Sequence, residues 1–192
     1  MGRDKALLEL EGRALLDRAS ACLAEVCDEV LLACGPEERY GDRGLRLVLD
    51  PPDTEYGHRA GPLAGLHAVI SAFPEQPPAH VAVLAVDIVG VTPELFRALE
   101  ARMRERGADA CLFATERGLE PLLAVYATSC REPMLRALRN GERRLISFHA
   151  GYGELKVAFL NQSELPPELG VDEPARNVNS PAEFLREGGA MP

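Results

Sequence analysis

The sequence predicts one α/β domain, in which helices lie on both faces of a mainly parallel sheet. Two observations favour this fold class. Short apolar strand patterns alternate with amphipathic helical patterns along the chain, which is typical of parallel sheets. The run 81–86, VAVLAV, is apolar at every position and rich in β-branched residues, as expected of a strand covered on both faces.

The same patterns place the other elements and set a single domain over residues 1–192. After a loop and a short extended piece in 1–12, we expect helices over 14–27, 62–73, 93–107 and 129–139, a helical turn at 143–148 and a terminal helix from 180. Strands are expected over 30–34, 46–49, 81–86, 110–114, 121–126 and 155–160. Thr92 is expected to cap a helix, and Ser129–Glu132 and Ser180–Glu183 to form capping boxes.

Composition excludes some classes of function. The formal net charge of −9 over 192 residues argues against a protein that holds nucleic acid on a broad basic surface. No apolar run approaches the roughly 20 residues that span a bilayer, and no signal peptide is visible. The five cysteines form no Cys-x-x-Cys pair, which favours reduced thiols in a cytoplasmic protein over a metal or redox site.

Two aspartates follow predicted strands at their carboxyl ends. Asp87 ends the apolar run at 81–86, and Asp50 ends the strand at 46–49. Open α/β sheets bind ligands at this edge, where a carboxylate can hold Mg²⁺ against phosphate oxygens. The alternative for Asp87 is a loop or helix-capping aspartate, and position alone does not decide between them.

A small-residue turn lies between these aspartates. Gly61-Pro62-Leu63-Ala64-Gly65 opens a predicted helix, whose first N–H groups can bind an anion or a base edge. Tight packing of helix on strand would explain the turn equally well. Lys5 and Arg3 can neutralise phosphate, and the alternative is that both are solvated charges. For Asn179 the alternative is a residue that only shapes a turn.

The order of these segments resembles the molybdenum cofactor guanylyltransferases, within the wider nucleotidyltransferase family of Rossmann-like fold. Residues 1–8, MGRDKALL, are similar to that family's Met-Gly-x-Asp-Lys-x-Leu-Leu signature, and GPLAG at 61–65 to its Gly-Pro-Leu-Ala-Gly turn. Val86-Asp87 corresponds to its Cys-Asp dipeptide. Later likenesses are GERR at 141–144 and NVNSP at 177–181, and the resemblance extends from Met1 to about Arg186.

The resemblance implies transfer of GMP from GTP to the molybdopterin cofactor, with release of pyrophosphate and with Mg²⁺ as cofactor. It assigns Lys5 and Asp87 catalytic roles, Lys5 on the phosphates and Asp87 on the metal. Asp50 would help to hold the guanosine, and cofactor-delivery proteins are possible partners. The resemblance also implies a nucleotide pocket framed by Gly61, Pro62, Leu63 and Gly65, and a pterin side with Arg143, Arg144 and Asn179.

The sequence departs from the family pattern at several positions. In the family, a strand and a Gly-rich phosphate loop precede the methionine of the signature, so we expect roughly 15 more residues upstream, by analogy with strand-plus-loop units. Val89, Gly35 and Glu120 stand where the family usually has proline, asparagine and histidine. Two alternatives stay open: a non-catalytic nucleotide-fold protein without its phosphate loop, or a related transferase that uses CTP.

Overall fold

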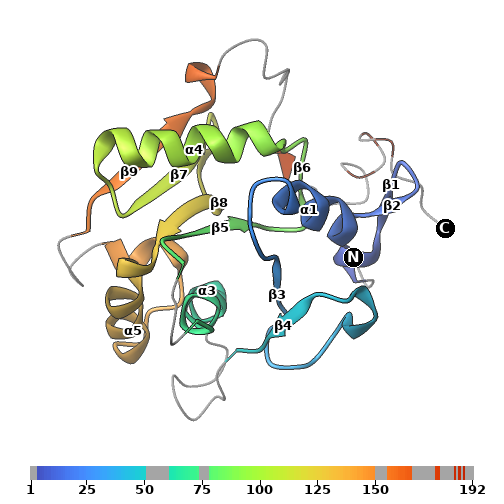
Figure 1. Cartoon of the computed structure of the whole chain (residues 1–192), viewed down its shortest axis with the longest axis horizontal. Coiled ribbons are helices and arrows are strands. Elements are labelled where there is room, and N and C mark those ends of the chain that lie inside the picture. Colours follow the sequence, from blue (N-terminus) through green and yellow to red (C-terminus); the bar gives the residue numbers. More distant parts are fainter. Residues whose placement is uncertain are drawn as a thin grey trace.

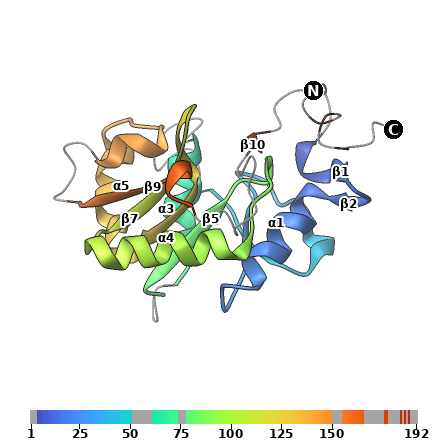
Figure 2. The ribbon, with the colours of Figure 1, turned by 90° about the horizontal axis from the view of Figure 1, so that it is seen from above.

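The fold places α-helices on both faces of a central sheet, as the sequence predicts (Figures 1 and 2). The computed structural model describes residues 4–50, 61–73, 78–149, 155–165 and 176–177, with 184, 186 and 188. Its α-helices are α1 (Leu15–Ala24), α3 (Gly61–Ser71), α4 (Pro93–Arg106) and α5 (Arg131–Arg139). Its strands are β1 (Glu9–Leu10), β2 (Arg13–Ala14), β3 (Leu31–Ala33), β4 (Arg46–Val48), β5 (His80–Leu84), β6 (Ile88–Val89), β7 (Ala110–Thr115), β8 (Gly118–Ala127), β9 (Val157–Asn161) and β10 (Arg176–Asn177).

The largest sheet has the order β5-β8-β7-β9, and its two faces carry different helices. α4 covers one face, while α3 and α5 cover the other (Figure 1). Alternation along the strands explains this, because successive side chains point to opposite faces. In β8, Leu123 and Val125 pack toward α4, whereas Ala124 and Tyr126 pack toward α3 and α5. The core is therefore split into two layers by the sheet.

The expectation of a mainly parallel sheet is wrong for the described strands. β3 pairs with β4 and β7 with β9 in parallel, but β8 is antiparallel to both β5 and β7. The reason is the short link between β7 and β8, where Thr115 pairs with Gly118 around two residues. Such a link suits an antiparallel hairpin, since a parallel crossover needs a dozen or more residues.

Two of the expected helix caps are also wrong. The side chain of Thr92 makes no capping hydrogen bond at the start of α4, although Pro93 occupies the first turn as predicted. Ser129 does not cap α5: its hydroxyl donates to Asp109 Oδ1 at 2.8 Å, and the helix begins later, at Arg131. The second expected capping box, at 180–183, lies outside the described residues.

A second, two-stranded sheet holds β3 and β4, and its described strands share no ladder with β5. α3 contacts both of its strands. β5 is therefore an edge strand of the larger sheet. The two candidate aspartates follow strands of different sheets, because Asp50 comes after β4 and Asp87 after β5. All five cysteines are free, and Cys34, Cys111 and Cys130 are buried, as expected of reduced thiols.

Candidate functional site

Lys5 and Asp87 meet directly, although 82 positions separate them. Lys5 Nζ donates to Asp87 Oδ2 at 3.2 Å, and the two side chains are 33% and 24% exposed. Lys5 begins a short 3-10 helix, Lys5–Leu7, which Asp4 caps by accepting from Ala6 N at 3.1 Å. Asp87 stands just beyond β5, at its carboxyl end. The pair offers a cation and a carboxylate side by side at the edge of the sheet.

Asp50 belongs to a second group of residues around the start of α3. Its backbone N–H donates to Gly35 O at 2.8 Å, which ties the end of β4 to the end of β3. A Cβ added at Gly65 would lie 3.3 Å from Asp50 Oδ1, so glycine lets the first turn of α3 approach this carboxylate closely. Burial raises the pKa of the Asp50 carboxyl. Partly desolvated, Asp50 is suited to accept hydrogen bonds from a ligand's N–H groups.

Gly61 makes the second close approach in this turn. Its backbone has φ +70°, and a Cβ there would lie 3.0 Å from the Arg143 carbonyl oxygen. Glycine is required for both reasons. The Leu63 side chain is fully buried in the core, so its part in framing a pocket is limited to its backbone, while Pro62 is exposed.

The two arginines of the predicted pterin side have different surroundings. Arg143 Nη1 donates to the carbonyls of Leu138 and Glu142, at 3.4 and 2.8 Å, near the end of α5. Its backbone packs on Gly61, which places it beside the predicted nucleotide turn. The Arg144 side chain is exposed.

The third pterin-side residue, Asn179, lies outside the described residues. The nearby β10 pairs antiparallel with β6, with Asn177 opposite Ile88 and Arg176 opposite Val89. Ile88 directly follows Asp87, so this late segment reaches the neighbourhood of the Lys5–Asp87 pair.

Sequence reasoning missed the residues that link the two groups. Arg39 Nη2 donates to Cys34 O at 3.0 Å and lies 3.9 Å from the position of a Gly35 Cβ, beside the segment that holds Asp50. Arg39 Nη1 lies 3.8 Å from Asp4 Oδ2, next to Lys5. Arg39 therefore bridges the Asp50 group and the Lys5–Asp87 pair. Periodicity gives no signal for such a residue, because it lies in an irregular loop.

The side chains at the Lys5–Asp87 pair suit a metal ion that also binds oxygen atoms of a ligand. Among the described residues, no group of three or more His, Cys, Asp or Glu side chains is arranged to hold a metal ion. In the pair, Asp87 supplies one carboxylate, with Oδ2 facing Lys5. Mg²⁺ commonly takes one or two protein carboxylates and completes its shell with water and substrate phosphates. The arrangement is compatible with Mg²⁺ bound together with a nucleotide.

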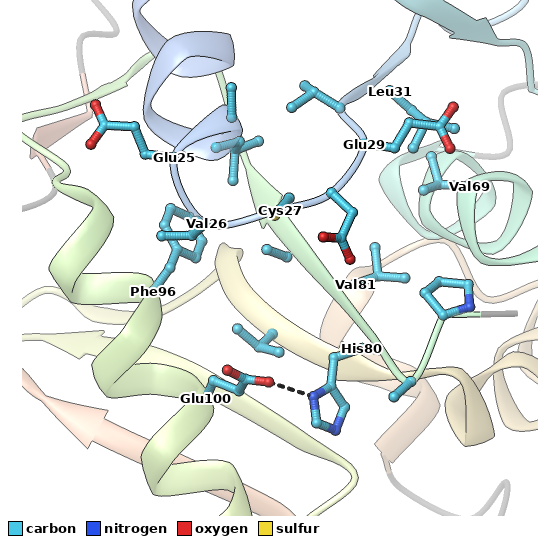
Figure 3. A pocket seen from close by; sticks show the side chains of 18 of the residues that line it. Glu25, Val26, Cys27, Glu29, Leu31, Val69, His80, Val81, Phe96 and Glu100 are labelled. Carbon is cyan, nitrogen blue, oxygen red and sulfur yellow. Dashed lines mark hydrogen bonds and ion pairs between the residues drawn. The ribbon is translucent and has the colours of Figure 1, made fainter.

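The structure also has a separate cavity of about 830 Å³, drawn in Figure 3. It is lined by the segment 23–31, by the start of β5 and by parts of α3 and α4. His80 Nδ1 and Glu100 Oε1 are 2.9 Å apart on its wall, and Glu100 also accepts from Arg104 at 2.7 Å. The cavity lies at the amino-terminal ends of β3 and β5, whereas Asp50 and Asp87 follow the carboxyl ends. None of the predicted site residues lines it.

Comparison with known proteins finds relatives over most of the chain. The family model described as "MobA-like NTP transferase domain" matches residues 1–154. A probable molybdenum cofactor guanylyltransferase of Pelotomaculum thermopropionicum is 32% identical over 188 residues, which cover 97% of this chain and 84% of that protein. One of Deinococcus radiodurans is 34% identical, covering 98% and 87%.

Solved structures give the same fold. Molybdopterin-guanine dinucleotide biosynthesis protein A of Archaeoglobus fulgidus superposes with a TM-score of 0.74 at 22% identity, over 97% of this chain and 90% of that one. The 2-C-methyl-D-erythritol 4-phosphate cytidylyltransferase of Thermus thermophilus gives 0.66 at 20% identity, over 96% and 92%. With the family match over most of its length, the chain belongs to the MobA-like NTP transferases.

Proposed function

We propose that this chain is a molybdenum cofactor guanylyltransferase, which transfers GMP from GTP to the molybdopterin cofactor and releases pyrophosphate. Near-full-length relatives of that description support the reaction. The observation that carries the chemistry is the contact of Lys5 with Asp87, because it pairs the charges that a triphosphate and its metal require.

The reaction needs alignment and charge compensation more than a protein nucleophile. The terminal phosphate of molybdopterin attacks the α-phosphorus of GTP, and the bond from that phosphorus to the pyrophosphate oxygen breaks. Both reactants are anionic, so a cation at the phosphates lowers their repulsion. Lys5 supplies this charge by turning from Asp87 Oδ2 to a phosphate oxygen. Bound Mg²⁺, held by Asp87, would neutralise charge on the phosphates and on the departing pyrophosphate.

The nucleoside is assigned to the other group of residues. The guanine base presents N–H donors, and Asp50 is the partly desolvated acceptor beside the turn 61–65. The first N–H groups of α3 suit an anion or a base edge. The relatives described as guanylyltransferases favour GTP over CTP, although a cytidylyltransferase shares the fold.

The acceptor is assigned to a separate set of residues. Arg143, Arg144 and Asn179 form the proposed pterin side, with the Arg143 backbone against Gly61. Delivery of the labile pterin by another protein is consistent with this reaction and is a further part of the proposal. Among the helices that the structure describes, none is long and apolar enough to cross a bilayer.

The test is turnover of GTP and molybdopterin with Mg²⁺ by the wild type and by Asp87→Ala and Lys5→Ala. We expect each substitution to lower kcat/KM by about 100-fold or more, the order seen when one charge-stabilising group is removed. Asp28→Ala is the matched control, because Asp28 is exposed and lines the separate cavity, which neither Lys5 nor Asp87 lines.

Replacing GTP with CTP in the same assay tests the choice of nucleotide. A wild type that turns over neither GTP nor CTP would favour the alternative of a non-catalytic nucleotide-fold protein. Equal turnover by wild type and Asp87→Ala would remove Asp87 from the mechanism.

A further inference from the structure

The Asp4 carboxylate joins the turn that carries Lys5 to a distant loop. One oxygen, Oδ1, accepts from Ala6 N at 3.1 Å and so caps the 3-10 helix that begins at Lys5. The other, Oδ2, accepts from the hydroxyl of Tyr40, in the loop between β3 and β4. Arg39 approaches the same oxygen at 3.8 Å. Asp4 therefore uses one oxygen on each segment.

Several contacts hold Arg39 and Tyr40 in place within the loop between β3 and β4. Arg39 lies over the Tyr40 ring, with its guanidinium carbon 5.5 Å from the ring centroid. Arg39 Nη2 donates to Cys34 O, and Cys34 Sγ donates to Arg39 O at 3.4 Å, which closes the loop after β3. These contacts fix Arg39 and Tyr40 relative to the end of β3.

Tyr40 adopts a backbone conformation that its side chain disfavours. Its φ of +62° and ψ of +28° lie in the left-handed region, which is uncommon for a bulky residue. Strained residues of this kind persist where neighbouring contacts hold them, and they gather at functional sites. Burial and the hydrogen bond to Asp4 raise the pKa of Tyr40 to about 12, so its hydroxyl stays protonated and able to donate.

We propose that Tyr40 and Arg39 are positioning residues for Lys5, and that they act through the Asp4 carboxylate. They hold the turn at Lys5 against the loop after β3, so that Nζ stays beside Asp87. The contact of Lys5 with phosphate rests on the proposed function, whereas the position of Lys5 does not.

Lysine acetylation tests this position without any nucleotide. The sequence contains two lysines, Lys5 and Lys156, and Lys156 is exposed, so it serves as an internal standard. Brief treatment of the folded protein with acetic anhydride, followed by mass spectrometry, gives the ratio of modification at the two lysines. We expect Tyr40→Phe to raise the Lys5/Lys156 ratio by about threefold, the effect of losing one hydrogen bond of ordinary strength.

Tyr126→Phe is the matched control, because it removes another hydroxyl that makes a single hydrogen bond, to Pro121 O at 2.8 Å, in the buried core. It should leave the ratio unchanged. Asp4→Ala should raise the ratio at least as much as Tyr40→Phe, and Tyr40→Phe added to Asp4→Ala should raise it no further. An unchanged ratio in Tyr40→Phe, or an equal rise in Tyr126→Phe, would overturn the proposal.

A binding measurement then separates this inference from the proposed function. We expect Tyr40→Phe to weaken Mg²⁺-GTP binding by about threefold in the wild type and to have no effect in Lys5→Ala. Equal weakening in both backgrounds would mean that Tyr40 acts on the fold in general, which overturns the positioning role. If Lys5→Ala binds GTP as the wild type does, the phosphate role of Lys5 fails, and the acetylation ratio still decides whether Tyr40 positions Lys5.

Discussion

Gly65→Ala should separate the stability of the chain from its affinity for nucleotide. Gly65 lies inside α3, where alanine is favoured over glycine by about 0.8–1.0 kcal/mol. The added Cβ would lie 3.3 Å from Asp50 Oδ1, slightly closer than ordinary contact, so the carboxylate must shift by a few tenths of an ångström. Asp50 is half-buried and can move, so we expect a net gain of about 0.5 kcal/mol and a Tm higher by about 1–2 °C.

Affinity should change in the opposite direction. A displaced Asp50 loses a charge-assisted hydrogen bond to the nucleoside, and we expect GTP binding to weaken by about tenfold. Thermal unfolding followed by circular dichroism and titration with Mg²⁺-GTP measure the two effects on one sample. In an Asp50→Ala background, Gly65→Ala should stabilise the chain and leave the already weak binding unchanged.

Either of two results would refute this reasoning. A fall in Tm of several degrees would mean that the start of α3 cannot accept even a methyl group, so the carboxylate is held more firmly than its exposure indicates. A higher Tm with unchanged GTP affinity would mean that Asp50 does not hold the nucleoside.

Three further predictions concern single substitutions. Gly61→Ala should cost about 2–4 kcal/mol in urea unfolding, because a left-handed conformation and a 3.0 Å approach to the Arg143 carbonyl both oppose the new Cβ; a loss below about 1 kcal/mol would contradict this. Asp50→Asn should weaken GTP binding and remove the pH dependence that Asp50 causes. The raised pKa of Asp50 makes wild-type GTP binding decline as the solution becomes acidic. If the affinities of wild type and Asp50→Asn for GTP change in parallel with pH, Asp50 does not hold the nucleoside. The hydrogen bond from Arg102 lowers the pKa of Glu164 from 4.5 to about 2, so its stabilising effect is present above pH 4.5 and is lost as the pH falls toward 2. In Glu164→Gln the free energy of unfolding should therefore fall less steeply between pH 4.5 and pH 2 than in the wild type. An equal slope in both proteins would show that Glu164 does not cause the acid loss of stability.

Most elements and the position of Asp87 could be predicted from local patterns. The apolar run at 81–86 gave β5 and placed Asp87 after its carboxyl end, and Pro93 marked the start of α4. Such signals are local, because side-chain periodicity and turn chemistry act over a few residues. The family likeness of residues 1–8 singled out Lys5, and the structure places its Nζ 3.2 Å from Asp87 Oδ2. Their joint role in catalysis stays a prediction.

What sequence reasoning missed depends on partners far apart in the chain. Ser129 has the spacing of a capping residue, yet its hydroxyl bonds to Asp109 on the approach to β7. Tyr40 has no distinctive neighbours in sequence, and its bond to Asp4 crosses 36 positions. The short link between β7 and β8 is enough to predict that β8 runs antiparallel to β7. The alternation of strands and helices elsewhere in the chain instead favours a parallel sheet.

The separation of the β3-β4 sheet from the β5-β8-β7-β9 sheet makes α3 a structural link between them. Since the described strands of the β3-β4 sheet and the larger sheet share no backbone ladder, helix packing contributes to holding Asp50 and Asp87 at a fixed separation, together with the loop contacts of Arg39. α3 contacts β3, β4 and α5, so it reaches both halves. A nucleotide at its first turn would brace this helix, and slower amide hydrogen exchange along α3 should then report occupancy of the site at either carboxylate.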